Sequence, residues 1–460
     1  MKISKSDALA ANSSRPTLRF EEQDLTSFAG LVLFQSLFAR LSLYRRLAGC
    51  FRHRRVSPIF PTAKIILLLI VHQLLGFRCL RESRFYDDDP MVLRVLGLRR
   101  LPDVSTISRQ LSGLDLASVE KLEGLRAELV LERVAALPCK RITLDFDGSV
   151  IGTGRRAEGV AVGYNKLKKG QRAYYPLFCT VAQTGQVLGV LNRSGNVHDS
   201  NGADAFILAC IARVRAVRTT RTVIEVRMDS AFFSDDIIDA LERVRVRYTI
   251  SVPFDRFAEL KSMVETRTDW HTIDDDRDAF EARWQPKSWK RSRRFILVRQ
   301  IAPEQRKRPL QLDLFEPRRY NFTFKAIVTN RRDRFADAVV CHEGRGSQEG
   351  IFAELKSENA LAYVPTRTWL GNRAFMSAAL MAHNLSRELT MVGANAERRA
   401  SGAKRATLWV FPRIGTIRRE LLQRAGRLIR PQGKLTLSMS ANEAVRMRIE
   451  TSLHSIEAVA

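Results

Sequence analysis

The chain has 460 residues, which is enough for two or three domains with a core each. Its 76 Lys and Arg outnumber 49 Asp and Glu and give a formal net charge of +27, so the surface is expected to attract polyanions, of which nucleic acid is the commonest. The arginines spread over almost the whole chain rather than along one amphipathic helix, which argues against a membrane-surface protein.

Apolar runs and cysteine spacing predict the compartment. The longest apolar run, Ile65–Val71, is too short to span a bilayer, and no signal-peptide pattern opens the chain. Six cysteines lie far apart without a spacing suited to zinc, which predicts free thiols in a reducing environment. We therefore expect a cytoplasmic protein.

The first third of the chain predicts helices. Residues 1–25 are polar and lack periodicity, so we expect a flexible lead, followed by a helical region over 26–138. One apolar stripe begins this region, and it comprises Leu31, Leu33, Phe34, Leu37 and Phe38. A second helix is predicted from Ala63 to Phe77, and Asp103 or Ser105 is typical of a further helix cap. Because the region is rich in Arg, we interpret it as DNA-binding; the alternative is a helical domain with solvated arginines, since no helix-turn-helix pattern is clear.

The stretch Arg141–Ser149 predicts a strand that delivers carboxylates at its end. Apolar and polar residues alternate from Ile142 to Asp147, which puts Asp145 and Asp147 on the same face. Hard divalent cations prefer carboxylate oxygens, so this end of the strand is a candidate metal site. The alternative is an edge strand with a solvated acidic face.

Residues 139–254 alternate between strand and helix patterns. Further strands are predicted over Tyr174–Ala182, Val187–Leu191, Val223–Met228 and Tyr248–Val252, and helices over Ala203–Val217 and Asp236–Val244. Three strands, helix, strand, helix, strand is the order of an α/β core of the RNase H-like, retroviral integrase type. In that order the first and fourth strands are neighbours, so Asp147 and Asp229 meet. The alternative for Asp229 is a turn or helix-cap residue.

Residues 255–340 predict a β-rich insertion, with strands over Phe295–Val298 and Phe322–Val328. Tryptophans sit here among Lys and Arg, so Trp284 and Trp289 are candidates for stacking on exposed bases beside bound phosphates. The alternative is that the tryptophans form the small core of the insertion.

Residues 342–356 predict a helix that returns to the core. At about 100° per residue, one polar stripe carries His342, Arg345, Glu349 and Lys356. A carboxylate flanked by two cations fits a site for metal and phosphate. The alternative is a solvent-facing helix with spaced charges, and Glu354 points away from the stripe.

These motifs resemble the DDE transposases of bacterial insertion sequences, in the subgroup with a Tyr-x2-Arg-x3-Glu-x6-Lys signature. Arg345, Glu349 and Lys356 match its spacing, and His342 replaces the expected Tyr. Asp147-Gly-Ser resembles the first-aspartate motif and Asp229-Ser-Ala-Phe the second. The resemblance runs from about residue 142 to 389, and it includes Gly163–Pro176 and Ser194–Asp199.

The resemblance implies a cut-and-paste transposase with an RNase H-like core over 139–254 and 341–390. Asp147, Asp229 and Glu349 would hold two Mg²⁺ ions, with Mn²⁺ as a substitute, and Asp145 remains an alternative to Asp147. The enzyme would cut at terminal inverted repeats and join the 3′-OH ends to target DNA, as a homodimer, in the bacterial cytoplasm with the nucleoid. Arg345, Lys356 and His342 would bind phosphates.

Two further segments are basic. Lys166, Lys168, Lys169 and Arg172 alternate with tyrosines, a pattern that suits a DNA backbone, although a solvated hairpin is the alternative. The basic region 391–460 predicts DNA or dimer contacts. Two other functions remain open: a stand-alone nuclease of the same fold, and a catalytically silent DNA-binding regulator derived from a transposase.

Overall fold

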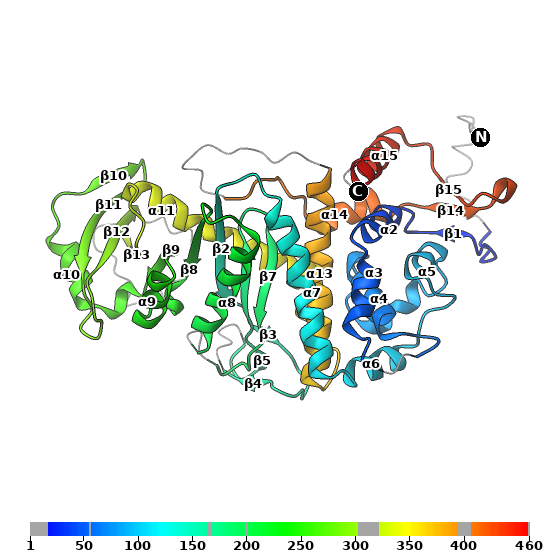
Figure 1. Ribbon diagram of the computed structural model, residues 1–460, viewed down its shortest axis with the longest axis horizontal. Coiled ribbons are helices and arrows are strands. Elements are labelled where there is room, and N and C mark those ends of the chain that lie inside the picture. Colours follow the sequence, from blue (N-terminus) through cyan, green and yellow to red (C-terminus); the bar gives the residue numbers. More distant parts are fainter. Residues whose placement is uncertain are drawn as a thin grey trace.

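The computed structural model describes residues 17–54, 57–163, 168–197, 201–301, 322–393 and 406–458. A helical region lies at one end of its longest axis, a sheet covered by helices lies in the middle, and an extension of that sheet lies at the other end (Figure 1). None of the described helices is long and apolar enough to cross a membrane.

The N-terminal part is helical, as predicted. Its helices are α2 (Leu31–Arg40), α3 (Leu43–Cys50), α4 (Thr62–Leu74), α5 (Pro90–Leu96), α6 (Val104–Ser112) and α7 (Leu116–Ala135), with a 3-10 turn η1 (Leu80–Phe85). The predicted apolar stripe of α2 is buried in full, and Asp103 is the N-cap residue of α6. The predicted second helix is α4, which ends earlier than expected, at Leu74.

The central sheet has the predicted RNase H-like order. Its core strands are β2 (Arg141–Gly148), β6 (Leu177–Val181), β7 (Gln186–Leu191), β8 (Val223–Met228) and β9 (Arg247–Val252), and its crossover helices are α8 (Ala203–Val217) and α9 (Asp235–Arg243). They lie in the order β7-β6-β2-β8-β9. Strand β6 is antiparallel to β2 and β7, whereas β8 is parallel to both β2 and β9. The predicted fold class is therefore confirmed.

Helices cover both faces of β2. Ile142, Leu144 and Phe146 pack with residues of α7 and α8 on one face. The opposite face of the sheet meets α11 (Phe335–Glu343), α12 (Ser347–Glu358) and α13 (Trp369–Val392), of which α13 lies over β6 and β7. On this face Thr143 and Asp145 of β2 are also buried. Since β2 has a strand on either side and no open face, the alternative of an edge strand with a solvated acidic face is wrong.

The insertion continues the central sheet instead of forming a separate one. It contains α10 (Ala258–Thr266), β10 (His271–Asp274), β11 (Arg277–Trp284), β12 (Arg293–Ile301) and β13 (Phe322–Thr329). Strand β13 pairs antiparallel with β9, so the sheet extends to nine strands in the order β10-β11-β12-β13-β9-β8-β2-β6-β7. Both strands predicted here lie within β12 and β13.

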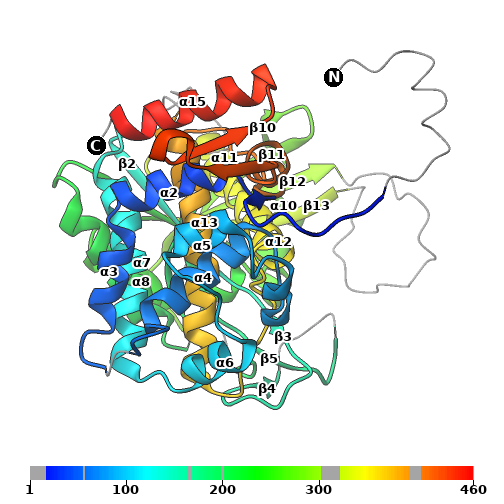
Figure 2. The ribbon, with the colours of Figure 1, turned by 90° about the vertical axis from the view of Figure 1, so that its right-hand side faces the viewer.

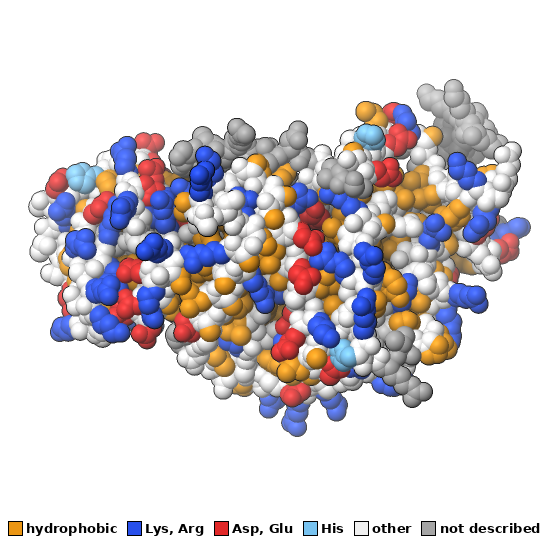
Figure 3. Space-filling view, in the orientation of Figure 1, with side chains coloured by type: hydrophobic (Ala, Val, Ile, Leu, Met, Phe, Trp, Pro, Cys, Tyr) orange, Lys and Arg blue, Asp and Glu red, His pale blue; other side chains and the backbone are white. Residues whose placement is uncertain are grey.

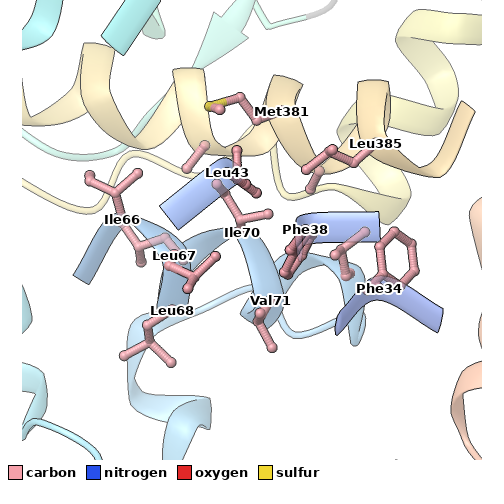
Figure 4. Packing of buried hydrophobic residues seen from close by; sticks show 14 of the residues in the cluster. Phe34, Phe38, Leu43, Ile66, Leu67, Leu68, Ile70, Val71, Met381 and Leu385 are labelled. Atoms are coloured by element: carbon pink, nitrogen blue, oxygen red, sulfur yellow. The ribbon is translucent and has the colours of Figure 1, made fainter. Parts of the chain in front are cut away.

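Helix α13 joins the helical region to the sheet. It is buried without a break from Ala374 to Leu389, as expected of a helix with neighbours on all sides. Figure 4 shows Met381 and Leu385 on the side of α13 that faces Ile70 of α4. On its other side, the Asn384 side chain accepts a hydrogen bond from the backbone N–H of Val187, at 2.8 Å. Figure 2 shows α13 behind α4 and α5.

Two small sheets complete the fold. The first joins β1 (Leu25–Thr26), β14 (Gly426–Ile429) and β15 (Thr436–Met439); the second joins β3 (Ile151–Gly152), β4 (Ala161–Val162) and β5 (Arg172–Tyr174). Beside the first sheet lie α14 (Ile414–Ile417), the π-helical turn η5 (Arg418–Leu422) and α15 (Glu443–Ala458), which packs on α2. Residues from both ends of the sequence thus lie in one corner (Figure 1).

Candidate active site

Asp147 and Asp229 lie at the carboxyl ends of the adjacent parallel strands β2 and β8. Phe146 is paired with Met228, so the two aspartates follow at the same level of the sheet. Both are only partly buried, and the Asp229 carboxylate accepts a hydrogen bond of 3.0 Å from the backbone N–H of Ala231. Asp229 therefore caps the short turn that follows β8, as the alternative supposed, and it also lies beside Asp147.

Two cations lie beside Asp147. Nη1 of Arg345 donates to its carboxylate at 3.2 Å. Lys356 is half-buried, and this burial lowers the pKa of its ammonium group, while the nearby charge of Asp147 raises that pKa in part. The predicted pair of cations on residues 342–356 therefore meets the first predicted carboxylate.

Asp145 has a different partner. Its carboxylate accepts two hydrogen bonds from the guanidinium of Arg227, at 2.6 and 2.7 Å, and both side chains are almost fully buried. Such a bidentate buried pair holds the carboxylate in the core of the sheet. Asp145 shares a face with Asp147, as predicted, but its position does not favour it as the first catalytic carboxylate.

The helix predicted over residues 342–356 is present but is interrupted by a 3-10 turn, across which the backbone keeps right-handed helical φ and ψ. Helix α11 ends at Glu343, a 3-10 turn η4 (Gly344–Gly346) follows, and α12 begins at Ser347. The glycines explain the break, because glycine is among the poorest helix formers.

His342, which precedes the 3-10 turn, is buried, whereas Glu349, which follows it, is exposed. The His342 ring is buried against β9, with Nε2 at 2.8 Å from the Ser251 hydroxyl and Nδ1 at 3.0 Å from the Thr249 hydroxyl. Burial, together with the positive charge of nearby Arg345, lowers the pKa of His342 to about 3. A neutral, enclosed imidazole does not support the predicted phosphate contact.

Glu349 lies in the first turn of α12 and is exposed. It is seven residues, about two helical turns, before Lys356 and so lies on the same face of α12. Glu354, in contrast, is buried: it pairs with Arg387 of α13 and accepts a 2.9 Å hydrogen bond from the backbone N–H of Ile414. Glu354 therefore connects α12 to its neighbours.

Within the described ranges, no three His, Cys, Asp or Glu side chains are gathered closely enough to hold a metal ion. The candidate ligand atoms are nevertheless carboxylate oxygens, the type that hard divalent cations prefer. Asp147 and Asp229 present carboxylate oxygens from neighbouring strand ends, and Glu349 adds a third carboxylate on the face of α12 that carries Lys356.

The other predicted DNA-contacting residues divide into two groups. Lys168, Lys169 and Arg172 are exposed around β5, in the small sheet that follows β2, whereas Lys166 lies outside the described residues. Trp284 and Trp289 are buried, with ring centroids 5.0 Å from Phe295 and 4.6 Å from Phe233, respectively. Their positions favour the alternative that the tryptophans belong to a core, and do not favour base stacking.

Sequence reasoning missed Arg227 and Glu225, which form buried ion pairs behind the site. Glu225 pairs with Arg331, and Arg227 pairs with Asp145. The signal was present in β8, since two charged residues at alternate positions of a buried apolar strand require charged partners. These pairs hold the ends of β2 and β8 beside α11.

An RNase H-like sheet with carboxylates at the ends of its first and fourth strands defines a class of enzymes that cut and transfer phosphodiester bonds. The chain matches the family described as Transposase DDE domain group 1 over residues 10–460. It belongs to this transposase family, and cut-and-paste transposition is the function that membership supports, ahead of a stand-alone nuclease or a silent regulator.

Three solved structures illustrate how distant the similarities are. A piggyBac transposase synaptic complex with hairpin DNA has 13% identity and a TM-score of 0.41, with 78% of this chain and 76% of that chain covered. The Mos1 mariner paired end complex with Mn has 11% identity and a TM-score of 0.18, with 37% and 56% covered. A pre-cleavage Mos1 transpososome has 12% identity and a TM-score of 0.17, with 37% and 57% covered. No protein with a curated description matches the chain.

Proposed function

We propose that this protein is the transposase of a bacterial insertion sequence, and that Asp147, Asp229 and Glu349 bind two Mg²⁺ ions. The observation that carries the proposal is the meeting of Asp147 with Arg345 and Lys356 beside Asp229, at adjacent ends of parallel strands. Three segments far apart in the sequence thus supply one acidic and basic cluster.

Each group has a chemical role in this proposal. Divalent ions bound by the three carboxylates supply charge that activates the attacking oxygen and stabilises the leaving oxygen at phosphorus. Arg345 and Lys356 neutralise Asp147 in the absence of DNA and bind the phosphate next to the scissile bond in its presence. Arg345 suits this task because its planar fork matches two phosphate oxygens.

The partner is double-stranded DNA, both the inverted repeats and the target, bound by a homodimer that pairs two ends. Lys168, Lys169 and Arg172 extend the basic surface from the end of β2 and would contact the backbone outside the scissile phosphate. The Arg345, Glu349 and Lys356 spacing supports the signature subgroup, while the buried His342 replaces its Tyr.

The test is cleavage of a duplex that carries the element's own end, with Mg²⁺ and with EDTA. We expect wild type to cut only with metal, and Glu349→Gln to lose about 10²–10³-fold or more in rate while still binding the duplex. Glu259→Gln is a matched control, because Glu259 is also an exposed glutamate in the first turn of a helix, but in the insertion. Equal cutting by Glu349→Gln and wild type would remove Glu349 from the site.

A further inference from the structure

A hollow of about 720 Å³ lies at the amino ends of strands β8 and β9, whereas the carboxylates lie at the opposite, carboxyl ends of the parallel strands. It is bounded by the end of α8 and the loop after it, the start of β8, and the turn that joins α9 to β9. Val223 lines the hollow and Asp229 follows the far end of the same strand, so the two sites are about 20 Å apart at about 3.3 Å per residue.

The lining is strongly cationic, and we call this site the arginine hollow. The six arginines that line it are Arg215, Arg218, Arg221, Arg243, Arg245 and Arg247. No carboxylate lines it, and five of the six arginines are exposed. Over much of the face shown in Figure 3, basic and acidic side chains are interspersed.

Three of these arginines have structural roles. Arg215 donates to the carbonyl of Val244, Arg243 donates to the carbonyl of Asp239, and Arg218 donates to carbonyls at the end of α7, including that of Leu137, at 2.9 Å. A cation near the carboxyl end of a helix stabilises that helix in any protein. These contacts therefore explain three of the six arginines without a ligand.

Arg221, Arg245 and Arg247 are not explained in this way. Their side chains make no hydrogen bond or ion pair with any part of the chain that the structure describes. Elsewhere several buried arginines are paired with acids, as Arg227 is with Asp145. The remaining three positive charges therefore face solvent with no counter-charge in the lining.

Arg245 lies at a backbone position that favours glycine. Helix α9 ends in a Schellman motif, in which the N–H of Val246 bonds to the carbonyl of Leu241 and the N–H of Arg245 to that of Glu242, each at 3.0 Å. Arg245 has φ of 53°, the left-handed conformation in which glycine is favoured. A guanidinium occupies this position despite the backbone cost.

We propose that the arginine hollow binds the sugar–phosphate backbone of duplex DNA that runs outside the candidate active site. Phosphates need cations and hydroxyl donors, and the loop adds Thr219 and Thr222 to the three uncompensated arginines. This inference rests on the proposed function only in that it takes DNA as the polyanion, since the hollow shares no residue with the carboxylate site.

The test measures binding of the full chain to a labelled duplex of arbitrary sequence, about three helical turns long, in EDTA, across a series of salt concentrations. Each phosphate contact adds about 0.9 to the slope of log affinity against log salt. We expect Arg221→Ala and Arg247→Ala each to weaken binding and to lower the magnitude of this slope by about 0.9. The triple variant, which combines both substitutions with Arg245→Gly, should lower it by about 2.7. Arg213→Ala, an exposed arginine of α8 outside the hollow, is the matched control and should change neither value.

Arg245→Gly separates binding from folding. Because glycine suits its backbone conformation, we expect the melting temperature to stay the same or rise while the affinity for DNA falls. The proposal is overturned if the triple variant binds like wild type, if Arg213→Ala loses as much as Arg221→Ala, or if the triple variant loses self-association instead of DNA affinity. If the variants lower the slope as expected but wild type cuts no element end, the proposed function is contradicted while the hollow remains supported.

Discussion

Asp145 and Asp147 lie two residues apart on β2, yet their surroundings assign them different tasks. Asp145 is enclosed with Arg227, whereas Asp147 reaches the strand end and remains 18% exposed beside Arg345. Removing one member of a buried ion pair leaves the other charge without compensation. The two positions therefore offer a matched test of structural and chemical roles.

We expect Asp145→Asn to lower the free energy of unfolding by about 3–5 kcal/mol, since Arg227 loses its buried partner. Asp147→Asn should change that free energy by less than about 1 kcal/mol but abolish cleavage. Urea unfolding and the cleavage assay measure the two effects. A stable Asp145→Asn variant without activity would instead place Asp145 in the chemistry.

Three buried histidines predict a loss of stability in acid. Burial lowers the pKa of His72 to about 4 and the pKa values of His342 and His383 to about 3. The unfolded chain takes up these protons near pH 6.5, and the folded chain does not. The unfolded state thus binds more protons below pH 6.5, so the free energy of unfolding falls as the pH falls from about 6.5 towards 4.

Each neutral buried histidine contributes about 1.4 kcal/mol per pH unit to this fall. We expect His342→Gln, measured by urea unfolding between pH 6 and pH 4.5, to reduce the slope by about that amount, because glutamine retains a donor and an acceptor for Ser251 and Thr249. His271→Gln, at an exposed edge strand, is the control and should leave the slope unchanged. An unaltered slope in His342→Gln would show that its ring is protonated in the folded state.

At the scale of elements, α12 contains a glycine that its packing does not require. A Cβ added to Gly350 would meet no atom within 4 Å. We expect Gly350→Ala to raise the free energy of unfolding by about 0.5–1 kcal/mol, since alanine loses less backbone freedom in a helix.

The contrasting glycine is Gly195, where a Cβ would lie 2.5 Å from the carbonyl oxygens of Ala161 and Ala173. Gly195→Ala should lower the free energy of unfolding by at least about 1 kcal/mol. Chemical denaturation of both variants provides the comparison. If Gly350→Ala is destabilising, the first turn of α12 is not helical in solution.

Local patterns predicted most elements of the catalytic core. The strand over Val223–Met228 and the helix over Ala203–Val217 have the bounds predicted, because alternation and helical periodicity are set by neighbours in sequence. The interruption at Gly344–Gly346 was not predicted, since the periodicity of polar residues continues across it. The pairing of β13 with β9 was also hidden, because strand partners depend on contacts distant in sequence.

The same limit applies to the site. The structure places Arg345 beside the carboxylate of Asp147 and Lys356 within reach of its charge. That these two cations bind phosphate there remains a prediction. Which face of a segment becomes enclosed depends on the assembled layers, so the burial of His342 was not predicted, and a core role for Trp284 and Trp289 was only one of two alternatives. Whether Glu349 binds metal with the two aspartates remains a prediction.

At the scale of the whole molecule, Arg418 joins the helical region to the core. Its guanidinium donates to the carbonyls of Gln73 and Leu74, at 2.7 and 2.8 Å. It also pairs with the carboxylate of Glu358 at 2.6 Å. One buried side chain therefore connects α4, α12 and η5.

We expect Arg418→Ala to lower the free energy of unfolding by about 3–5 kcal/mol, because Glu358 and two carbonyls lose their partner together. Arg419→Ala, at the exposed neighbouring position, should remain within about 0.5 kcal/mol of wild type. Urea unfolding of the two variants decides the point. Equal stability of both would mean that water replaces Arg418 without loss.

The corner shared by β1, β14, α2 and α15 has a consequence for synthesis. Helix α2 is made early, whereas Ile449 and Ile456 of α15, which belong to the same apolar cluster, are made much later. Helices α3, α5 and α13 also pack on α2, but the part of its cover that α15 supplies is missing until α15 has been made. Exposed apolar surface of this kind promotes aggregation, so we expect chains that stop before α15 to be less soluble than the full chain.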